Sequence, residues 1–212
     1  MDNKLNYQFY DRTEMLPFVP KGVVEVLDVG CGSGKFGHML KNERGCKVTG
    51  VEPFPAAAEA ARKVLDHVHE LVVEEAVHQL PKQHFDLICF NDVLEHLVDP
   101  WSVLESCKPL LKPGAHILAS VPNVLNLGNL KEVLTTRDWK YRDEGILDRT
   151  HLRFFTRIST IRMFEEAGYQ VTHIEGINLF LTKKTKLLRL VFPTWMSDSL
   201  PLQFAVLATP QL

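Results

Sequence analysis

The sequence predicts an α/β fold with a Rossmann-like, doubly wound, parallel sheet. Three observations support it. Short apolar runs alternate with helical patterns of apolar residues along most of the chain. The apolar run that ends at Val29 passes through a turn with alternate glycines into a helix beginning near Ser33. Polar residues follow four of the strands, at the edge where open parallel sheets bind ligands.

The first half of the chain has the most regular alternation. The expected strands cover residues 24–29, 46–51, 70–73, 86–91 and 116–121, and the expected helices cover 35–42, 56–65 and 101–111. Pro53 ends the second strand, and Lys112, Pro113 and Gly114 form a turn. The strands therefore all run in the same direction, with helices between them.

The second half is less regular. Helices are expected at 125–134 and 158–167, the second one ending at Gly168, and strands at 169–174 and 203–209. Residues 177–200 form an insertion between these last two strands. The total is seven strands.

Composition excludes several classes of protein. The 212 residues suit one domain, and a net charge of −2 gives no sign of a nucleic-acid-binding surface. The four cysteines form no C-x-x-C pair and are expected to be buried apolar residues. No signal peptide or bilayer-spanning stretch is recognisable, so a cytoplasmic protein is expected.

The glycine turn carries the most specific chemistry. Gly30, Gly32 and Gly34 let the chain turn sharply and let a ligand approach the backbone without a Cβ in the way. In the G-x-G-x-x-G pattern of dinucleotide sites the third glycine comes one residue later, which disfavours a nicotinamide dehydrogenase. Asp28 would repel a pyrophosphate, so a ligand with a positive charge is favoured.

Asp28-x-Gly30-x-Gly32-x-Gly34 after an apolar strand resembles the first motif of class I S-adenosylmethionine-dependent methyltransferases. The resemblance implies S-adenosylmethionine as cofactor and S-adenosylhomocysteine as product. It also implies a sheet whose seventh strand is antiparallel. The whole chain, 1–212, is then one methyltransferase domain, with an N-terminal cap (1–22), a cofactor-binding half (23–122) and an acceptor-side half (123–212) that contains the insertion at 177–201.

The resemblance assigns cofactor-binding roles to residues at the predicted strand ends. Asp28 and the glycine turn with Cys31 would hold the methionine end, Glu52 and Pro53 the ribose, and Asn91 with Asp92 the region of the sulfonium. Glu75 and Ala76 would hold the adenine. Because Glu74 and Glu75 are adjacent, the acid at the adenine stays ambiguous, with Glu75 favoured.

Two segments are candidates for handling the acceptor. A hydroxyl acceptor must lose a proton, and histidine is the side chain suited to this near neutral pH. Asp148 with His151 is one candidate, against the alternative that Asp148 closes a turn and His151 packs structurally. His96 is the other candidate, as a base or a substrate contact.

The run Asp92-x-x-Glu95-His96 resembles a Glu-x-x-Glu-His run that is linked to a divalent metal in ubiquinone-pathway O-methyltransferases. Here Asp replaces the first Glu, and many methyltransferases share Glu-His without a metal, so no metal is expected. His67 and His69 lack an evident third ligand and are expected to be a surface pair.

Residues 145–156 resemble a segment of methyltransferases from bacterial cell-surface polysaccharide pathways. We therefore expect a small-molecule acceptor, a hydroxyl of a sugar or related metabolite. Asn91 to Leu94 lack the Asn/Asp-Pro-Pro-aromatic run of methyltransferases that modify nucleic-acid amines, so no nucleic-acid substrate is expected. A non-catalytic S-adenosylmethionine-binding or regulatory protein is the alternative.

Two peripheral segments have open interpretations. Tyr10 and Arg12 could close the site, or belong to an amphipathic helix packed on the surface. The basic, apolar segment 183–195 could contact a membrane, form a lid or form a subunit interface, which leaves a homodimer open.

Overall fold

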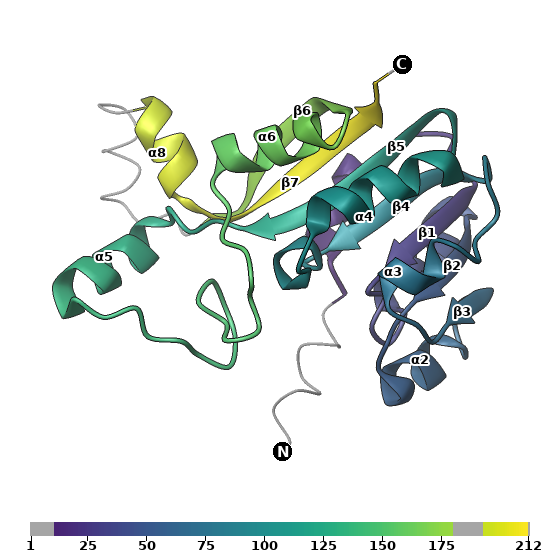
Figure 1. Ribbon diagram of the computed structural model, residues 1–212, viewed down its shortest axis with the longest axis horizontal. Helices are drawn as coiled ribbons and strands as arrows, with labels where there is room; N and C mark the ends of the chain where they lie inside the picture. The colour runs from purple at the N-terminus through teal and green to yellow at the C-terminus, as the bar shows by residue number, and fades with distance from the viewer. Residues whose placement is uncertain (1–10, 180–192, 212) are drawn as a thin grey trace.

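The computed structural model describes residues 11–179 and 193–211. In these residues seven strands form one sheet with the order β3-β2-β1-β4-β5-β7-β6 (Figure 1). The strands are β1 (Glu25–Val29), β2 (Lys47–Val51), β3 (His67–His69), β4 (Phe85–Asn91), β5 (Leu111–Pro122), β6 (Tyr169–Leu179) and β7 (Pro201–Pro210). The predicted α/β fold is confirmed.

Strand direction follows the expected arrangement. β1 pairs in parallel with β2 and β4, and β4 pairs in parallel with β5. β7 lies between β5 and β6 and is antiparallel to both. Each crossover connection brings the chain back in its original direction, so β1, β2 and β4 end at the same edge of the sheet.

The α-helices are α1 (Lys35–Arg44), α2 (Pro55–Ala61), α3 (Val73–Ala76), α4 (Pro100–Cys107), α5 (Leu127–Thr136), α6 (Arg157–Glu166) and α8 (Pro193–Ser199). Three short 3₁₀ helices are η2 (Thr13–Phe18), η3 (Leu94–His96) and η4 (Lys108–Leu110). Local sequence explains several of the starts. Asp99 caps α4 just before Pro100, and Thr156 with Ser159 forms a capping box on α6.

The helices cover both faces of the sheet. One apolar cluster packs α3, α4 and α6 on one face, and a second packs η2, α1 and α2 on the other (Figure 1). Side chains alternate along a strand, so Leu27 and Val29 of β1 enter the first cluster and Val26 enters the second. Burial on both faces explains why the parallel strands are continuous apolar runs.

The third strand was predicted three residues too late. It was expected at 70–73, but β3 covers His67–His69, and these two histidines are strand residues. Val73 begins helix α3 instead, because Val73, Ala76 and Val77 at helical spacing pack into the core. Residues 112–114, predicted as a turn, lie in β5 where its register with β4 shifts.

The acceptor-side half differs most from a regular α/β pattern. α5 has no buried residue and extends away from the sheet (Figure 1). Most of the basic segment 183–195 lies outside the described residues, as does Tyr10. None of the described helices is long and apolar enough to cross a membrane.

Two glycines with similar backbone angles test the packing of the turn. Gly30 has φ +66° and Gly45 has φ +70°, but only at Gly30 would an added Cβ lie 2.5 Å from Cγ2 of Val93. Both substitutions to Ala carry the left-handed backbone cost of about 1–2 kcal/mol. We expect Gly30→Ala to lose a further 1–3 kcal/mol or so from overpacking. Urea unfolding without ligand measures the difference, and equal losses would contradict this packing.

Candidate active site

A cavity of about 630 Å³ opens at the carboxyl ends of β1, β2 and β4. Its volume lies in the range of small-molecule sites. The lining comes mainly from Arg12 and from residues 28–32, 51–54, 72–74, 91–93, 96–98 and 148–150. Segments from both halves of the chain therefore share one cavity.

The glycine turn forms one wall. The Gly30 N–H donates to the Val51 carbonyl oxygen at 2.8 Å, which holds the turn against the end of β2. Gly30, Cys31 and Gly32 line the cavity, whereas Gly34 does not and its N–H donates to the Cys31 carbonyl oxygen. Gly34 is instead the N-cap residue of α1, with φ +80°.

Glu52 is buried at the end of β2, with both carboxylate oxygens bonded to the backbone. Oε2 accepts from the Gly32 N–H at 2.8 Å and Oε1 from the Phe54 N–H at 3.0 Å. Burial raises the pKa of Glu52, against the lowering effect of these two hydrogen bonds. Each oxygen keeps a lone pair, which suits a pair of neighbouring hydroxyl groups.

Asp28 is 2% exposed, and its Oδ2 has no hydrogen-bond partner in the described part of the chain. Burial, followed by repulsion from Glu52, raises the pKa of Asp28 to about 7. A cation at this end of the cavity would compensate both effects, because it favours the ionised carboxylate.

The third strand end differs from the expected arrangement. Val72, Val73 and Glu74 line the cavity, whereas Glu75 and Ala76 do not. Glu75 points to solvent and Ala76 is buried in the core. Because this segment is helical, successive side chains turn by about 100°, so the strand alternation assumed for Glu75 does not apply.

Asn91 ends β4, Asp92 follows it, and both line the cavity. Both polar atoms of the Asn91 side chain are buried without a partner in the described residues. Asp92 has a left-handed backbone, with φ +54°. Its carboxylate accepts from Arg12, from the Ser120 hydroxyl and from the Gln203 amide at 2.6 Å.

On the acceptor side, His96 lines the cavity and is held by a neighbouring loop. Its Nδ1 lies 3.2 Å from the Thr150 carbonyl oxygen and 3.1 Å from Thr150 Oγ1. The Thr150 hydroxyl donates to Asp148 Oδ1 at 2.6 Å, and the Thr150 N–H donates to the same oxygen at 2.7 Å. Asp148 therefore supports His96 through Thr150.

The structure does not bring Asp148 and His151 together as the expected side-chain pair. The Asp148 carboxylate accepts a hydrogen bond from the Thr150 N–H, while His151 Nδ1 lies 3.1 Å from the Ile146 carbonyl oxygen. His151 Nε2 faces Glu95 Oε1 at 4.0 Å, behind the cavity wall, and burial lowers the pKa of His151. The hydrogen bonds from Thr150 to the Asp148 carboxylate agree with the alternative that Asp148 closes a turn.

Glu95 is the site residue whose environment the sequence does not reveal. It is fully buried, and neither carboxylate oxygen has a hydrogen-bond partner among the described residues. Burial, followed by repulsion from Asp92, raises the pKa of Glu95 well above its usual value. Its carbonyl oxygen accepts from the N–H groups of Leu152 and Arg153, which fixes that loop against η3. No spacing in the sequence predicts this contact.

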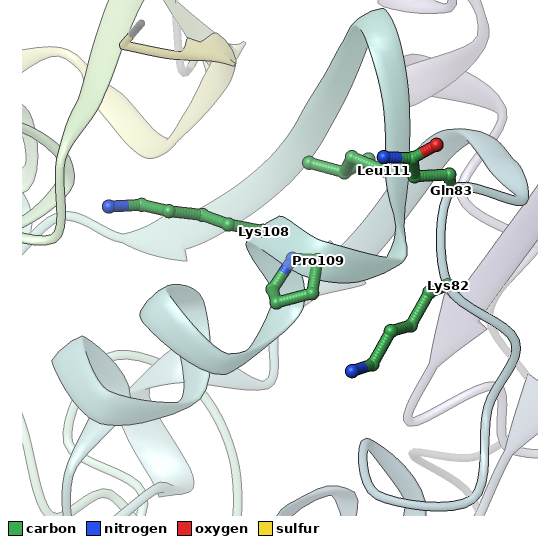
Figure 2. Close-up of a pocket in the computed structure, with 5 residues that line it drawn as sticks. All are labelled: Lys82, Gln83, Lys108, Pro109 and Leu111. Atoms are coloured by element: carbon green, nitrogen blue, oxygen red, sulfur yellow. The ribbon is translucent and has the colours of Figure 1, made fainter.

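A second hollow of about 250 Å³ lies at the start of β5, among Lys82, Gln83, Lys108, Pro109 and Leu111 (Figure 2). The amino groups of the two lysine side chains lie apart in this view and do not converge on a common centre (Figure 2). Lys108 lies over the Tyr169 ring, 5.4 Å from its centroid. The residues that line this hollow include no carboxylate, histidine or glycine turn of the kind that lines the larger cavity.

Comparison with known proteins agrees with these observations. The family model described as a methyltransferase domain matches residues 1–174. A ubiquinone biosynthesis O-methyltransferase of Yersinia pestis is 40% identical over 106 residues, which are 47% of this chain. The match covers only 43% of that relative's length.

Solved structures share the fold. A methyltransferase described as dependent on S-adenosylmethionine (SAM), from Archaeoglobus fulgidus, has a TM-score of 0.68 at 20% identity, over 89% of this chain and 86% of its own. One from Thermotoga maritima, described as a possible histamine N-methyltransferase, has a TM-score of 0.66 at 20% identity, over 98% and 92%.

The family match covers most of the chain, and the seven-stranded, mostly parallel sheet with an antiparallel last strand is the one expected from the first-motif resemblance. The chain therefore belongs to the methyltransferase domain family, within the class I S-adenosylmethionine-dependent methyltransferases.

Proposed function

We propose that this protein transfers the methyl group of S-adenosylmethionine to a hydroxyl oxygen of an uncharged small molecule, a sugar or related metabolite. The observation that carries the proposal is the single cavity, which joins the glycine turn and Glu52 to the acceptor-side residues His96 and Thr150. Donor and acceptor can therefore bind side by side, as direct displacement requires.

The cofactor roles follow from the environment of each side chain. Asp28, buried and partly unpartnered, faces the ammonium of the methionine end. Glu52 accepts from the ribose hydroxyls, with Pro53 beside it, and Glu74 replaces Glu75 at the adenine. The unpartnered amide of Asn91 lies beside the reacting sulfur.

On the acceptor side, His96 faces the cavity, so we assign it the contact with the acceptor hydroxyl, which must lose its proton during attack. Asp148 acts through Thr150 to orient the His96 ring. His151 packs against His96 with ring centroids 4.7 Å apart. Asp148 and His151 are positioning residues in this proposal.

The charges that line the cavity, and the similarity to an O-methyltransferase, support an uncharged hydroxyl acceptor. Carboxylates outnumber guanidinium groups in the lining, and this favours a cationic donor and disfavours an anionic acceptor. The acids are Asp28, Glu52, Glu74, Asp92, Asp143 and Asp148, against Arg12 and Arg149. The relative from Yersinia pestis is named an O-methyltransferase, and residues 145–156 resemble a segment of polysaccharide-pathway enzymes.

The first prediction separates catalysis from cofactor binding. With S-adenosylmethionine and a panel of monosaccharide, disaccharide and phenolic acceptors, we expect His96→Gln to lower S-adenosylhomocysteine production by about 100-fold or more. Its affinity for S-adenosylhomocysteine, measured by calorimetry, should stay unchanged. His38→Gln, an exposed control on α1, should retain both. Cofactor binding without transfer to any acceptor would instead favour the non-catalytic alternative.

The second prediction compares substitutions of two adjacent glutamates to test which of them contacts the adenine. Because Glu74 lines the cavity and Glu75 does not, Glu74→Gln should weaken S-adenosylhomocysteine binding about two- to tenfold, the effect of one hydrogen bond. Glu75→Gln should leave binding unchanged. Calorimetric titration of the two variants decides, and the reverse result would restore Glu75 to this role.

The buried Asp28 predicts a pH dependence. Its pKa in the free protein is about 7, and a bound ammonium lowers this pKa, so binding releases protons and strengthens as pH rises. From about pH 8 to about pH 6, S-adenosylhomocysteine affinity should fall roughly tenfold, because only about a tenth of Asp28 stays ionised. Asp28→Asn should bind weakly with a flat profile, and the same slope in both proteins would assign the effect to another group.

A further inference from the structure

Exposed aromatic side chains adjoin the acceptor side of the cavity. In the part of the chain whose side chains the structure describes, three large aromatic residues are exposed: Phe54 in the cavity lining, and Trp139 and Tyr141 in the loop between α5 and α6. Trp139 is 40% exposed and Tyr141 is 51% exposed. This loop lies outside the sheet (Figure 1). Single exposed apolar residues are normal on a surface, whereas aromatic side chains grouped beside a binding site indicate contact with a ligand.

The same loop lines the cavity a few residues further along the chain. Residues 143 and 148–150 belong to the lining. The Arg149 N–H donates to the Arg142 carbonyl oxygen at 2.9 Å, which folds the loop back on itself. Tyr141 directly precedes Arg142, so the exposed aromatic residues continue the acceptor wall of the cavity outward.

A row of rings connects Trp139 to His96 inside the cavity. The ring centroids of Trp139 and Phe154 are 5.3 Å apart, and those of Phe154 and His151 are 6.4 Å apart. His151 in turn packs against His96. These separations are typical of aromatic pairs. Trp139 is therefore the outer end of a row of rings that begins at the proposed contact with the acceptor hydroxyl.

The Trp139 ring is held in place by an anchored neighbour. Its planes with Phe154 cross at 84°, and a T-shaped contact of this kind leaves at least one face of the indole uncovered by Phe154. Phe154 is fixed on both sides, because the Arg153 N–H donates to the Glu95 carbonyl oxygen at 3.0 Å and Phe155 is buried. A ring that is already positioned loses little freedom when a ligand binds.

The charges of the loop are balanced. Residues 137–150 contain four basic and four acidic side chains, and Asp143 forms an ion pair with Arg149 at 2.9 Å. A nucleic acid or an anionic membrane would require an excess of positive charge. Carboxylate and guanidinium groups side by side offer both acceptors and donors to hydroxyl groups. Aromatic faces next to such groups suit a sugar, because a sugar ring has a C–H face and a rim of hydroxyls.

We infer that Trp139, together with Tyr141, forms a second sugar subsite outside the cavity, so that the acceptor contains at least two linked sugar units. One unit enters the cavity and meets His96, and the next unit stacks its C–H face on the indole of Trp139. The inference rests on the proposed transfer to a sugar hydroxyl.

The size of the cavity supports this division. A volume of about 630 Å³ is that of a site for one drug-sized ligand, and S-adenosylmethionine is itself a ligand of this size. Little more than one sugar ring fits beside it. A further unit of the acceptor therefore lies outside, over the loop that carries Trp139.

The test compares disaccharides with monosaccharides by calorimetric titration of the full chain saturated with S-adenosylhomocysteine. The probes are the methyl glycosides of glucose, galactose, mannose and N-acetylglucosamine, and disaccharides built from these units. We expect at least one disaccharide to bind more tightly than either of its units. Trp139→Ala should weaken the binding of that disaccharide about three- to tenfold, the effect of one aromatic contact, and leave monosaccharide binding unchanged. Trp139→Phe should restore most of the loss.

Leu134→Ala is the matched control, because Leu134 is 75% exposed on α5 and is aliphatic. It should change neither affinity, and all variants should keep the wild-type affinity for S-adenosylhomocysteine. Equal losses in Leu134→Ala and Trp139→Ala, without rescue by Trp139→Phe, would show a general apolar contact and overturn the inference. Dissociation of a dimer by Trp139→Ala in sedimentation, with unchanged disaccharide binding, would assign this surface to a second copy of the chain.

A second measurement needs no loss of affinity. In the ¹⁵N-labelled wild-type chain the three tryptophans give three indole N–H signals, and Trp139→Phe identifies one of them. Addition of the disaccharide should shift this signal. A disaccharide that shifts only the other indole signals would contradict the proposed subsite, as would a set of disaccharides that bind no better than their units.

Methyl transfer separates this inference from the proposed function. Equal kcat/KM for monosaccharides and disaccharides, in both the wild type and Trp139→Ala, would leave the proposed function standing and eliminate the subsite. Disaccharide binding that depends on Trp139, without transfer to any sugar, would support the subsite and count against the proposed reaction.

Discussion

The hydrogen bonds around Asp92 hold the whole site together. Its carboxylate joins the end of β4 to Ser120 on β5, Gln203 on β7 and Arg12 from the N-terminal segment. The chain then turns through the left-handed conformation of Asp92 into η3, which carries Glu95 and His96. This one carboxylate therefore links β5, β7 and the N-terminal segment to the turn between β4 and η3.

Buried carboxylates that lack a full set of partners define the two ends of the site. Asp28 lies at the cofactor end and Glu95 behind the acceptor end, each with at least one oxygen that no described residue satisfies. Burying such groups costs free energy that the fold must supply elsewhere. Burial raises the pKa of both carboxyl groups, because the ionised form loses its hydration.

The sheet and the glycine turn were predictable because their signals are local. Apolar periodicity and turn residues specify strands and helices over a few residues, and Asp28 and Glu52 follow directly from the strand ends. The third strand was the exception. Its apolar run, 71–73, suits a strand by composition, but Val73 packs as the first turn of a helix, which brings Glu74 and not Glu75 to the cavity.

The sequence by itself determined the fold class, and it identified Asp28, Glu52 and Asn91 at strand ends that line the cavity, because these features depend on neighbours within one strand–turn–helix unit. Only the tertiary structure decided the acceptor side. There η3 meets a loop more than fifty residues later, pairing His96 with Thr150 and Glu95 with His151. Contacts over that separation leave no periodic signal, because they depend on how two segments dock and not on the spacing within either one.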